Sequence, residues 1–334
     1  MKNMKKSKTK YIIVALLALL VILGILAAFN ILKSHTPNND PQRLNITEDT
    51  TYDALCDSLE ASSSFRLIAK ALGLDERVRP GSYLVEPHMN NLALVRKLRN
   101  GQQDPIRLTI GKFRTPQQLD EYLNSKLMHN DFDVPLDSFH IILPDTYEFY
   151  WTVTPEQFMQ RMRKEYDKFW LEKVGANGEY RFELLSMSDN IPETKLAAII
   201  IASIVEEETN YGPEKPLIAN VYWNRLDNGI PLQADPTVKY AVGDFALKRI
   251  LNKHLKVESP FNTYLHNGLP PAPICLPSKA TIDAVIEGED LETNYLYFCA
   301  SEKMDGTHRF ATTLAEHNRN AQRFHLALNK LGVK

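Results

Sequence analysis

An uncharged apolar stretch near the N-terminus constrains this chain more than any other feature of its sequence. Residues 11–32 contain no charged side chain, and they follow a segment rich in lysine. At about 1.5 Å of rise per residue, a helix of this length spans about 33 Å, which is enough to cross a hydrocarbon core of about 30 Å. The sequence therefore predicts one transmembrane helix at residues 11–32, preceded by Lys2, Lys5, Lys6, Lys8 and Lys10.

These lysines predict the orientation of the helix. Positive charges stay in the cytoplasm, so residues 1–10 form a predicted cytoplasmic tail and the remainder a predicted extracytoplasmic part of a single-pass bacterial inner (cytoplasmic) membrane protein. A cleaved signal peptide is the alternative, but the apolar run exceeds an h-region of about 7–15 residues and no A-x-A site follows it. There is no ATP outside the membrane, which favours hydrolases, lyases, binding modules and scaffolds.

Composition and charge limit the classes of protein to which this chain can belong. The 334-residue chain is 44% hydrophobic and 24% charged, as ordinary folded proteins are, and its length suggests more than one domain. A net charge of −2 gives no indication of nucleic-acid binding. The cysteines Cys56, Cys275 and Cys299 are too few for a disulfide scaffold and favour free buried thiols over a single bridge.

Changes of pattern divide the rest of the chain into a linker and two folded parts. Residues 33–44 are polar and contain proline, which predicts a linker. Residues 45–104 predict a small α+β module, whose layout resembles that of a LysM glycan-binding module. Residues 105–334 predict a larger mixed α/β domain, so the predicted fold class is α+β. Its predicted elements include a strand at 105–110, helices at 155–174, 190–209, 215–229 and 312–331, and a hairpin of 295–301 with 308–312.

The helix predicted at 190–209 is apolar on nearly all sides and ends in three consecutive acids, Glu206, Glu207 and Glu208. Acids at a helix C-terminus are disfavoured by the helix dipole, and adjacent carboxylates repel one another. Both effects, together with partial burial, raise carboxyl pKa values, as a general acid at neutral pH requires. The alternative is that all three are solvated acids at a helix end. Periodicity cannot choose among them, because every face of the helix is apolar.

A dense series of polar and aromatic residues follows this helix in rigid, proline-containing loops. Amide side chains bind hydroxyl groups and aromatic rings stack on sugar faces, so this composition is typical of a carbohydrate groove. The candidate groove residues are Asn224, Arg225, Gln233, Asp235, Thr237, Tyr240, Asn262 and Tyr264.

Five ordered blocks of sequence closely resemble the YceG-like family of endolytic murein transglycosylases. The blocks are IASIVEEET, NRLDNGIPLQADPTVKYA, NTYLHNGLPPAPI, YLYFCAS and DGTHRFATTLAEHN, and the earlier segments RPGSYLV and LPDTYEFY are also similar. The resemblance covers nearly the whole chain, and five blocks in order make it highly specific. The chain departs from the family's usual Glu-Gly after the strand at 105–110, because Gly111 is followed there by Lys112.

The resemblance implies a reaction and a catalytic residue. In the family the catalytic acid is the second glutamate of a Glu-x-Glu-Thr motif that follows Ser-Ile-Val, and this position is Glu208. Glu207 takes the variable middle position, and Glu206 matches the other acid, which supports Glu208 or the fold. The implied reaction is non-hydrolytic cleavage of the β-1,4 bond between N-acetylmuramic acid and N-acetylglucosamine, which leaves 1,6-anhydro ends and terminates strand elongation.

The resemblance also implies peptidoglycan glycan strands as substrate, peptidoglycan synthases (penicillin-binding proteins) as partners, and no cofactor. One carboxyl group acts as acid and then as base, so the positive charge that develops on the sugar needs further stabilisation. For Asp235, capping of the following helix is an equal alternative to a role in the site. For Arg225, a structural role is favoured over binding a substrate peptide carboxylate. The candidates for positioning and stabilisation are Gln233, Asp235, Asn262 and Tyr264.

Two rival functions stay open from the sequence. One is a hydrolase on the same fold in which Asp235 activates water, and the other is a non-enzymatic wall-binding scaffold. A metal site at His308 and His317 lacks a third ligand with suitable spacing, so hydrogen bonding in the core or groove is favoured for both histidines. The serines of DSLEASSSF lack the flanking glycines of a nucleophile elbow, which argues against a serine hydrolase.

Overall fold

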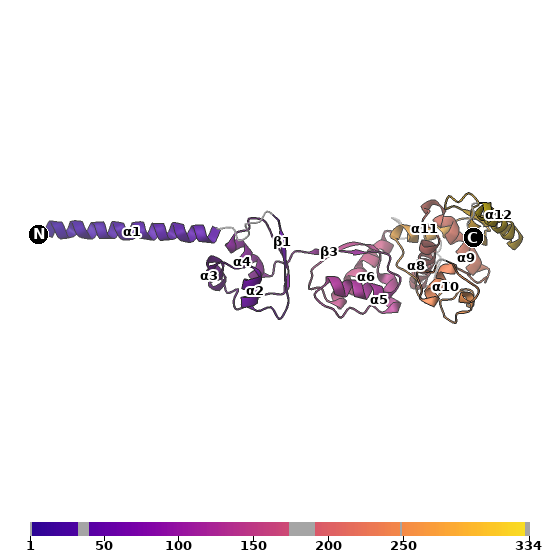
Figure 1. The fold of residues 1–334 in the computed structure, drawn as a ribbon, viewed down its shortest axis with the longest axis horizontal. Coiled ribbons are helices and arrows are strands. Elements are labelled where there is room, and N and C mark those ends of the chain that lie inside the picture. Colours follow the sequence, from indigo (N-terminus) through magenta and orange to yellow (C-terminus); the bar gives the residue numbers. More distant parts are fainter. Residues whose placement is uncertain (1, 33–39, 174–190, 248, 331–334) are drawn as a thin grey trace. The chain divides into compact units, whose positions relative to one another are not determined.

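The computed structural model describes residues 2–32, 40–173, 191–247 and 249–330, and it has the mixed α+β architecture predicted from the sequence (Figure 1). The chain divides into two compact units, which are described one at a time. The first comprises Met1–Leu108, Lys126–His129 and Glu148–Val153, and the second comprises Thr109–Ser125, Asn130–Tyr147 and Thr154–Lys334. Most of the predicted linker, at 33–39, lies outside the described residues.

Helix α1 covers Lys2–Leu32 and contains the stretch for which a membrane span is predicted. Its side chains from Tyr11 to Leu26 are exposed. Among the described residues, no helix combines the length and the apolar character that crossing a membrane requires. The transmembrane helix stays a prediction from the sequence.

A two-stranded antiparallel sheet and three helices form the small module of the first unit. Strand β1 (Gln42–Ile46) pairs with β2 (Gly81–Val85). Each helix begins after a side chain that accepts a hydrogen bond from one of the first free backbone amides, which stabilises the helix start. The helices are α2 (Tyr52–Ser58), α3 (Ser63–Ala71) and α4 (Asn91–Asn100), and the capping residues are Thr51, Ser62 and Asn90.

Tyr83 of β2 lies in the core of this module. Its side chain is fully buried, and its hydroxyl donates a 3.0 Å hydrogen bond to the backbone oxygen of Arg79. Cys56 and Phe65 belong to the same buried cluster. Tyr83 therefore satisfies its polar atom inside the module and contributes packing.

The second unit contains most of the helices that the structure describes. Strand β3 (Ile106–Ile110) pairs with β4 (Asp145–Phe149), and the residues of both strands are divided between the two units. The predicted strand, helices and hairpin are all present. The predicted helix ends at 174, 190 and 331 lie outside the described residues. The other elements are α5 (Pro116–Lys126), η1 (Leu136–Ile141), α6 (Pro155–Leu171), α8 (Ile191–Glu208), η2 (Gly212–Glu214), α9 (Lys215–Asp227), α10 (Asp235–Val242), η3 (His254–Lys256), α11 (Lys279–Glu289), β5 (Tyr297–Ala300), β6 (His308–Ala311) and α12 (Leu314–Lys330).

Helices α8, α9 and α11 pack on one another and form the core around the three acids; Figure 1 shows them grouped in the C-terminal part of the chain. Ile201, Ile204 and Val205 of α8 are fully buried. A helix that is apolar all round requires neighbours on several sides, and α9, α11 and the loop before α11 supply them. The C-terminal end of α8 is consequently held in a fixed place.

Helices α9 and α11 approach each other closely at Gly288. A methyl group at this position would collide with the backbone oxygen of Pro216 and would lie 2.9 Å from Cβ of Ala219. The backbone oxygen of Gly288 also accepts a 2.8 Å hydrogen bond from Asn220 Nδ2. Glycine is therefore required for this spacing of the two helices.

Strands β5 and β6 form the predicted antiparallel hairpin, and α12 packs against both strands. Ala300 stands opposite His308, and Cys299 stands opposite Arg309. All three cysteines are free thiols, as favoured from the sequence, and Cys56 and Cys275 are buried.

Candidate active site

The three consecutive acids at the end of α8 lie in three different environments. Glu206 accepts hydrogen bonds from Lys215 Nζ (2.9 Å), Ser278 Oγ (3.2 Å) and Thr281 Oγ1. Burial opposes ionisation of this carboxyl, but the donors Thr281 and Lys215 outweigh burial and hold the pKa of Glu206 below its usual value. Glu206 is therefore an ionised link between α8, α9 and α11.

Glu207 is held by two cations. Its Oε1 lies 3.0 Å from Lys112 Nζ, and its Oε2 accepts a 3.0 Å hydrogen bond from Arg114 Nη2. Burial again opposes ionisation, and the hydrogen bonds and charges of Arg114 and Lys112 hold the pKa of Glu207 below its usual value. Lys112 belongs to the short segment in which the sequence departs from the family pattern, and the structure gives it a carboxylate partner.

Glu208 differs from both neighbours because no cation neutralises it within hydrogen-bonding distance among the described contacts. Its Oε1 accepts a 2.8 Å hydrogen bond from the hydroxyl of Tyr222 on α9. Burial raises the pKa of Glu208 to about 7; the Tyr222 hydrogen bond opposes this shift, and the charges of Asp235 and Glu207 add to it. A carboxyl group with this pKa can release and recover a proton near neutral pH.

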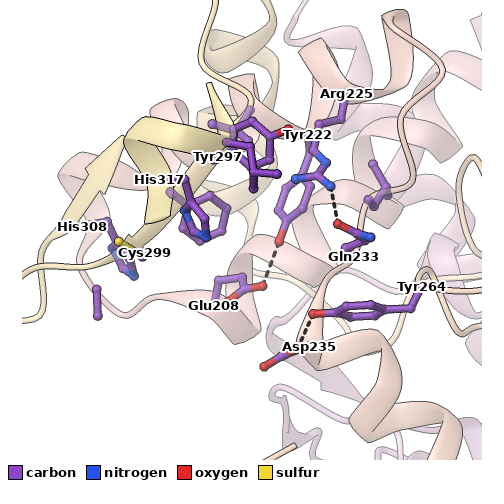
Figure 2. Close-up of a pocket in the computed structure, with 15 residues that line it drawn as sticks. Glu208, Tyr222, Arg225, Gln233, Asp235, Tyr264, Tyr297, Cys299, His308 and His317 are labelled. Carbon is purple, nitrogen blue, oxygen red and sulfur yellow. Dashed lines mark hydrogen bonds between the residues drawn. The ribbon is translucent and has the colours of Figure 1, made fainter. Parts of the chain in front are cut away.

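Glu208 opens into a cavity of about 430 Å³, referred to below as the Glu208 cavity. One wall comes from α8, α9, α10 and the loops around them, and the other comes from the β5–β6 hairpin and the start of α12 (Figure 2). The lining residues are Glu208, Val221, Tyr222, Arg225, Leu232, Gln233, Asp235, Tyr264, Tyr297, Phe298, Cys299, Ala300, His308, Leu314 and His317.

Asp235 faces the Glu208 cavity from the first residue of α10. Its Oδ1 accepts a 2.7 Å hydrogen bond from the hydroxyl of Tyr264, and Figure 2 shows the two side chains meeting on the Glu208 side of the cavity. The N-cap of α10 is Ala234, and no side chain caps the helix. The alternative that Asp235 caps this helix is therefore wrong, because its carboxylate is directed to Tyr264.

The buried Arg225 and the exposed Gln233 form a hydrogen-bonded pair that lines the same cavity. Arg225 donates to the backbone oxygens of Pro231 (2.9 Å) and Leu296 (3.0 Å) and to Gln233 Oε1 (2.8 Å). Burial lowers the pKa of Arg225 from its usual value. These three contacts fit the structural role favoured from the sequence. Gln233 has a φ of 50°, a left-handed conformation that side chains other than glycine rarely adopt and that clusters at functional sites.

Two other candidate groove residues lie outside the cavity lining and hold the framework together. Asn224 donates from Nδ2 to the backbone oxygens of Thr293 (2.9 Å) and Tyr295 (3.0 Å), which fixes the chain leading into β5. Thr237 is fully buried, and its hydroxyl donates a 2.7 Å hydrogen bond to the backbone oxygen of Ala234.

Tyr240 and Asn262 also lie outside the lining residues. The ring of Tyr240 packs on that of Phe261 with centroids 4.6 Å apart. Asn262 is fully buried and donates from Nδ2 to the backbone oxygens of Leu255 (3.1 Å) and Val257 (2.9 Å). Both residues therefore shape the loop that carries Tyr264, and neither faces the cavity directly.

The sequence did not identify Val221 and Tyr222 of α9, or residues 297–300 of β5, as lining residues. Tyr222 lies one helical turn before Arg225, so helical spacing from Arg225 could have identified it. His308 Nδ1 lies 2.9 Å from Glu214 Oε2, and the ring of His317 packs on that of Tyr297 at 5.5 Å. Both histidines line the Glu208 cavity, and His308 lies within hydrogen-bonding distance of Glu214, as the interpretation favoured from the sequence requires of it. Among the described residues, no group of three or more metal-binding side chains is arranged around an ion site.

Comparison with known proteins adds independent information. A family model described as the YceG-like family matches residues 44–323. A Bacillus subtilis protein named endolytic murein transglycosylase is 40% identical over 126 residues, which cover 38% of this chain and 34% of that protein. A Streptococcus pneumoniae protein of the same name is 29% identical over 183 residues, covering 54% of this chain and 31% of that protein. The matches thus span about a third of these relatives' length.

A solved structure supports the fold. The crystal structure of a putative YceG-like protein from Listeria monocytogenes superposes with a TM-score of 0.50 and 25% sequence identity. The alignment covers 84% of this chain and 99% of that one. The likeness therefore extends over the α+β architecture and is not confined to one module.

Proposed function

The chain belongs to the YceG-like family, and on this basis we propose that it is an endolytic lytic transglycosylase of peptidoglycan. The observation that carries the proposal is the position of Glu208, at the end of a buried helix and facing the cavity, where burial raises its pKa to about 7. The substrate is a glycan strand, cleaved at the β-1,4 bond between N-acetylmuramic acid and N-acetylglucosamine. The products are a strand ending in 1,6-anhydro-N-acetylmuramic acid and a strand that begins with a free 4-hydroxyl.

The first step is proton transfer from Glu208 to the glycosidic oxygen. Tyr222 donates to Oε1 and so leaves Oε2 to carry the proton into the cavity. The carbon–oxygen bond to C1 breaks as the oxygen receives the proton, and N-acetylglucosamine leaves with a neutral hydroxyl. A carboxyl group with a pKa of about 7 is protonated in a substantial fraction of molecules at neutral pH, as a general acid must be.

In the second step the Glu208 carboxylate takes the proton from the C6 hydroxyl of the muramic sugar. The C6 oxygen closes on C1, which forms the anhydro ring and returns Glu208 to its protonated state. No water is consumed, and the number of protons is unchanged. Ordinary glycosidases need two carboxyl groups because a water molecule or a covalent intermediate enters the reaction.

Asp235 is the proposed source of electrostatic stabilisation. Its carboxylate lies on the cavity and is oriented by Tyr264. A negative charge near C1 stabilises the positive charge that develops on the sugar ring in the transition state. The same charge favours the protonated form of Glu208 before the reaction. Gln233 and Arg225, which are joined by a hydrogen bond, line the same wall.

Product analysis tests the reaction type directly. Purified sacculi are digested in water enriched in ¹⁸O by the wild-type protein and by Glu208→Gln. The masses of the fragments are then measured by mass spectrometry. The lyase gives unlabelled anhydro ends, whereas a hydrolase that uses Asp235 to activate water gives labelled reducing ends. Glu208→Gln keeps the fold and glycan binding but loses cleavage by at least about 10²-fold, because a general acid is removed. Retention of full turnover by this variant would show that Glu208 is not the acid.

A non-enzymatic scaffold is the remaining alternative, and a cellular assay distinguishes it. A strain whose only copy carries Glu208→Gln keeps a scaffolding function and loses an enzymatic one, while the level of the protein is followed by immunoblot. Unchanged strand length in this strain would favour the scaffold.

The place of action is part of the proposal. The apolar stretch at 11–32 supports a single membrane anchor with the two folded parts on the extracytoplasmic face, and the layout of residues 45–104 supports a LysM-like glycan contact. An anchored cavity would act close to the membrane, where peptidoglycan synthases extend new strands. Membrane fractionation of the whole chain beside a variant lacking residues 11–32 tests the anchor, and the synthase contact is tested by crosslinking in the membrane fraction.

A further inference from the structure

The segment that follows β3 is fastened to the end of α8 through Glu207. Lys112 and Arg114 each lie 3.0 Å from one of the two oxygens of this carboxylate. The Glu207 side chain is only 12% exposed, whereas Lys112 and Arg114 are 37% and 29% exposed. Two partly buried cations on one buried carboxylate form a stronger link than a surface ion pair does.

Other contacts fix the same segment independently of the ion pairs. The backbone amide of Leu276 donates a 2.8 Å hydrogen bond to the backbone oxygen of Phe113. The guanidinium of Arg114 lies over the ring of Phe245, 5.3 Å from its centroid. The segment 111–114 is therefore held between α8, the loop before α11 and the region after α10, and it does not depend on Glu207 alone for its place.

We propose that Lys112 and Arg114 act as a clamp on Glu207, and that the clamped Glu207 is a positioning residue that fixes Glu208 and tunes the charge around it. The inference rests on the proposed role of Glu208 as general acid. Glu207 is the immediate neighbour of Glu208 at the last turn of α8, so the direction of the Glu208 side chain depends on where this turn ends. A clamp that holds the turn keeps Glu208 directed at Tyr222 and at the cavity.

Charge gives the clamp a second effect. The ionised Glu207 favours the protonated form of its neighbour Glu208. Lys112 and Arg114 partly cancel this charge, so the pair of cations and the carboxylate act on Glu208 with opposite signs. The other ionisable groups around Glu208 are Tyr222 and Arg225 of α9, Asp235 of α10, Tyr264, Tyr297 and Cys299 of β5, His308 of β6 and His317 of α12.

Because the Glu207 carboxylate and its two cations shift the Glu208 pKa in opposite directions, the dependence of kcat/KM on pH tests the inference. Glu208 must be protonated to start the reaction, so activity falls as pH rises through its pKa. Glu207→Gln removes a negative charge and leaves two cations, which moves this basic limb to lower pH by about half a unit or more. Lys112→Met removes a positive charge and moves the limb to higher pH by about half a unit, and Arg114→Met does the same.

Lys279→Met is the matched control. The Lys279–Asp145 pair (2.6 Å) also joins the early part of the second unit to its helical part, but it makes no contact with Glu207. Loss of this pair leaves the pH limb in place. Shifts in the same direction for Glu207→Gln and Lys112→Met, or equal shifts in Lys279→Met, would overturn the inference and leave Glu207 a structural link only.

A carboxyl-carbon NMR titration separates this inference from the proposed function. The Glu208 signal is assigned by its absence in Glu208→Gln, and its midpoint is followed in each clamp variant without substrate. Opposite shifts of this midpoint support the clamp even if the wild-type protein cleaves no glycan. If Glu208→Gln retains full turnover, the proposed function fails while the titration still decides the clamp. Unmoved midpoints in all three clamp variants would rule the clamp out.

Discussion

The hydroxyl of Tyr222 on α9 donates a 2.8 Å hydrogen bond to Oε1 of Glu208 at the end of α8. Tyr222 is itself almost fully buried, and its ring packs edge-on against Phe298 of the hairpin with centroids 5.9 Å apart. Burial and the neighbouring Glu208 charge both raise the pKa of Tyr222 well above its usual value, so it remains a donor at any working pH. The orientation of Glu208 is therefore set by Tyr222, whose ring is held by Phe298 and whose hydroxyl is held by the Glu208 carboxyl group itself.

Tyr222→Phe removes this donor while keeping the ring. The hydrogen bond stabilises the Glu208 carboxylate, so its loss raises the Glu208 pKa further and moves the basic limb of kcat/KM to higher pH. The carboxyl also loses its orientation, and kcat falls by about 10-fold or more. Tyr240→Phe serves as control, because Tyr240 lies outside the cavity lining. A basic limb that stays in place in Tyr222→Phe would contradict the assigned hydrogen bond.

Stability depends on pH through the same carboxyl group. The pKa of Glu208 is about 7 in the folded chain and 4.5 for an ordinary glutamate, so the folded state holds the proton more tightly than the unfolded state. This contribution to the free energy of unfolding is fully present below about pH 4.5 and is lost as pH rises through 7, at a total of about 3 kcal/mol.

Glu208→Gln removes this loss, because an amide does not ionise. Urea unfolding at pH 5 and pH 8 therefore shows a smaller decrease in the free energy of unfolding for the variant than for the wild type. At pH 8 the variant is the more stable protein. Equal pH dependence of the two proteins would mean that the Glu208 pKa is not raised by folding.

Asp235→Asn tests the second carboxylate. Removing its negative charge lowers the Glu208 pKa, so the basic limb moves to lower pH, and the amide stabilises the developing sugar cation less well than the carboxylate does. Cleavage slows by about 10²-fold, but the remaining product still carries anhydro ends. Tyr264→Phe is the companion variant, because it keeps the charge and removes the 2.7 Å hydrogen bond. Labelled reducing ends from the wild type that disappear in Asp235→Asn would instead favour the hydrolase.

Gly288→Ala tests the packing of α9 on α11. The added methyl group has no space beside Pro216 and Ala219, so the helices must separate and the chain loses about 1–3 kcal/mol of stability. Chemical denaturation measures this loss. Gly229→Ala is a less suitable comparison because Gly229 has a φ of 64°, whereas Gly212→Ala meets no neighbouring atoms within 4 Å and no strained backbone angle. A stability loss in Gly288→Ala no larger than in Gly212→Ala would disprove the close approach.

The sequence predicts the elements of the second unit well, because their signals are local. The apolar run that becomes α8 and the alternation that becomes the hairpin are each complete within one segment of chain. Because these signals are local, they could not distinguish the three glutamates. Periodicity left all three glutamates equivalent, and their different environments arise from Thr281, Lys112 and Tyr222, which are distant in sequence or on another helix.

Asp235 shows the limit of local rules in a single residue. An aspartate at the start of a helix is a common N-cap, yet this carboxylate accepts a hydrogen bond from Tyr264, 29 residues later in the chain. Asn224, Thr237 and Asn262 show the same limit, since polar residues in loops or on helices can satisfy buried backbone groups. Composition alone does not distinguish such residues from those that face a ligand.

The two-walled construction of the Glu208 cavity has a consequence during synthesis of the chain. The wall formed by β5, β6 and the start of α12 (residues 297–317) is translated after Glu208, beginning about ninety residues later. Until that last portion has been made and has folded back, this wall of the cavity is absent. The cavity that Glu208 faces is therefore complete only after the last part of the chain has been made.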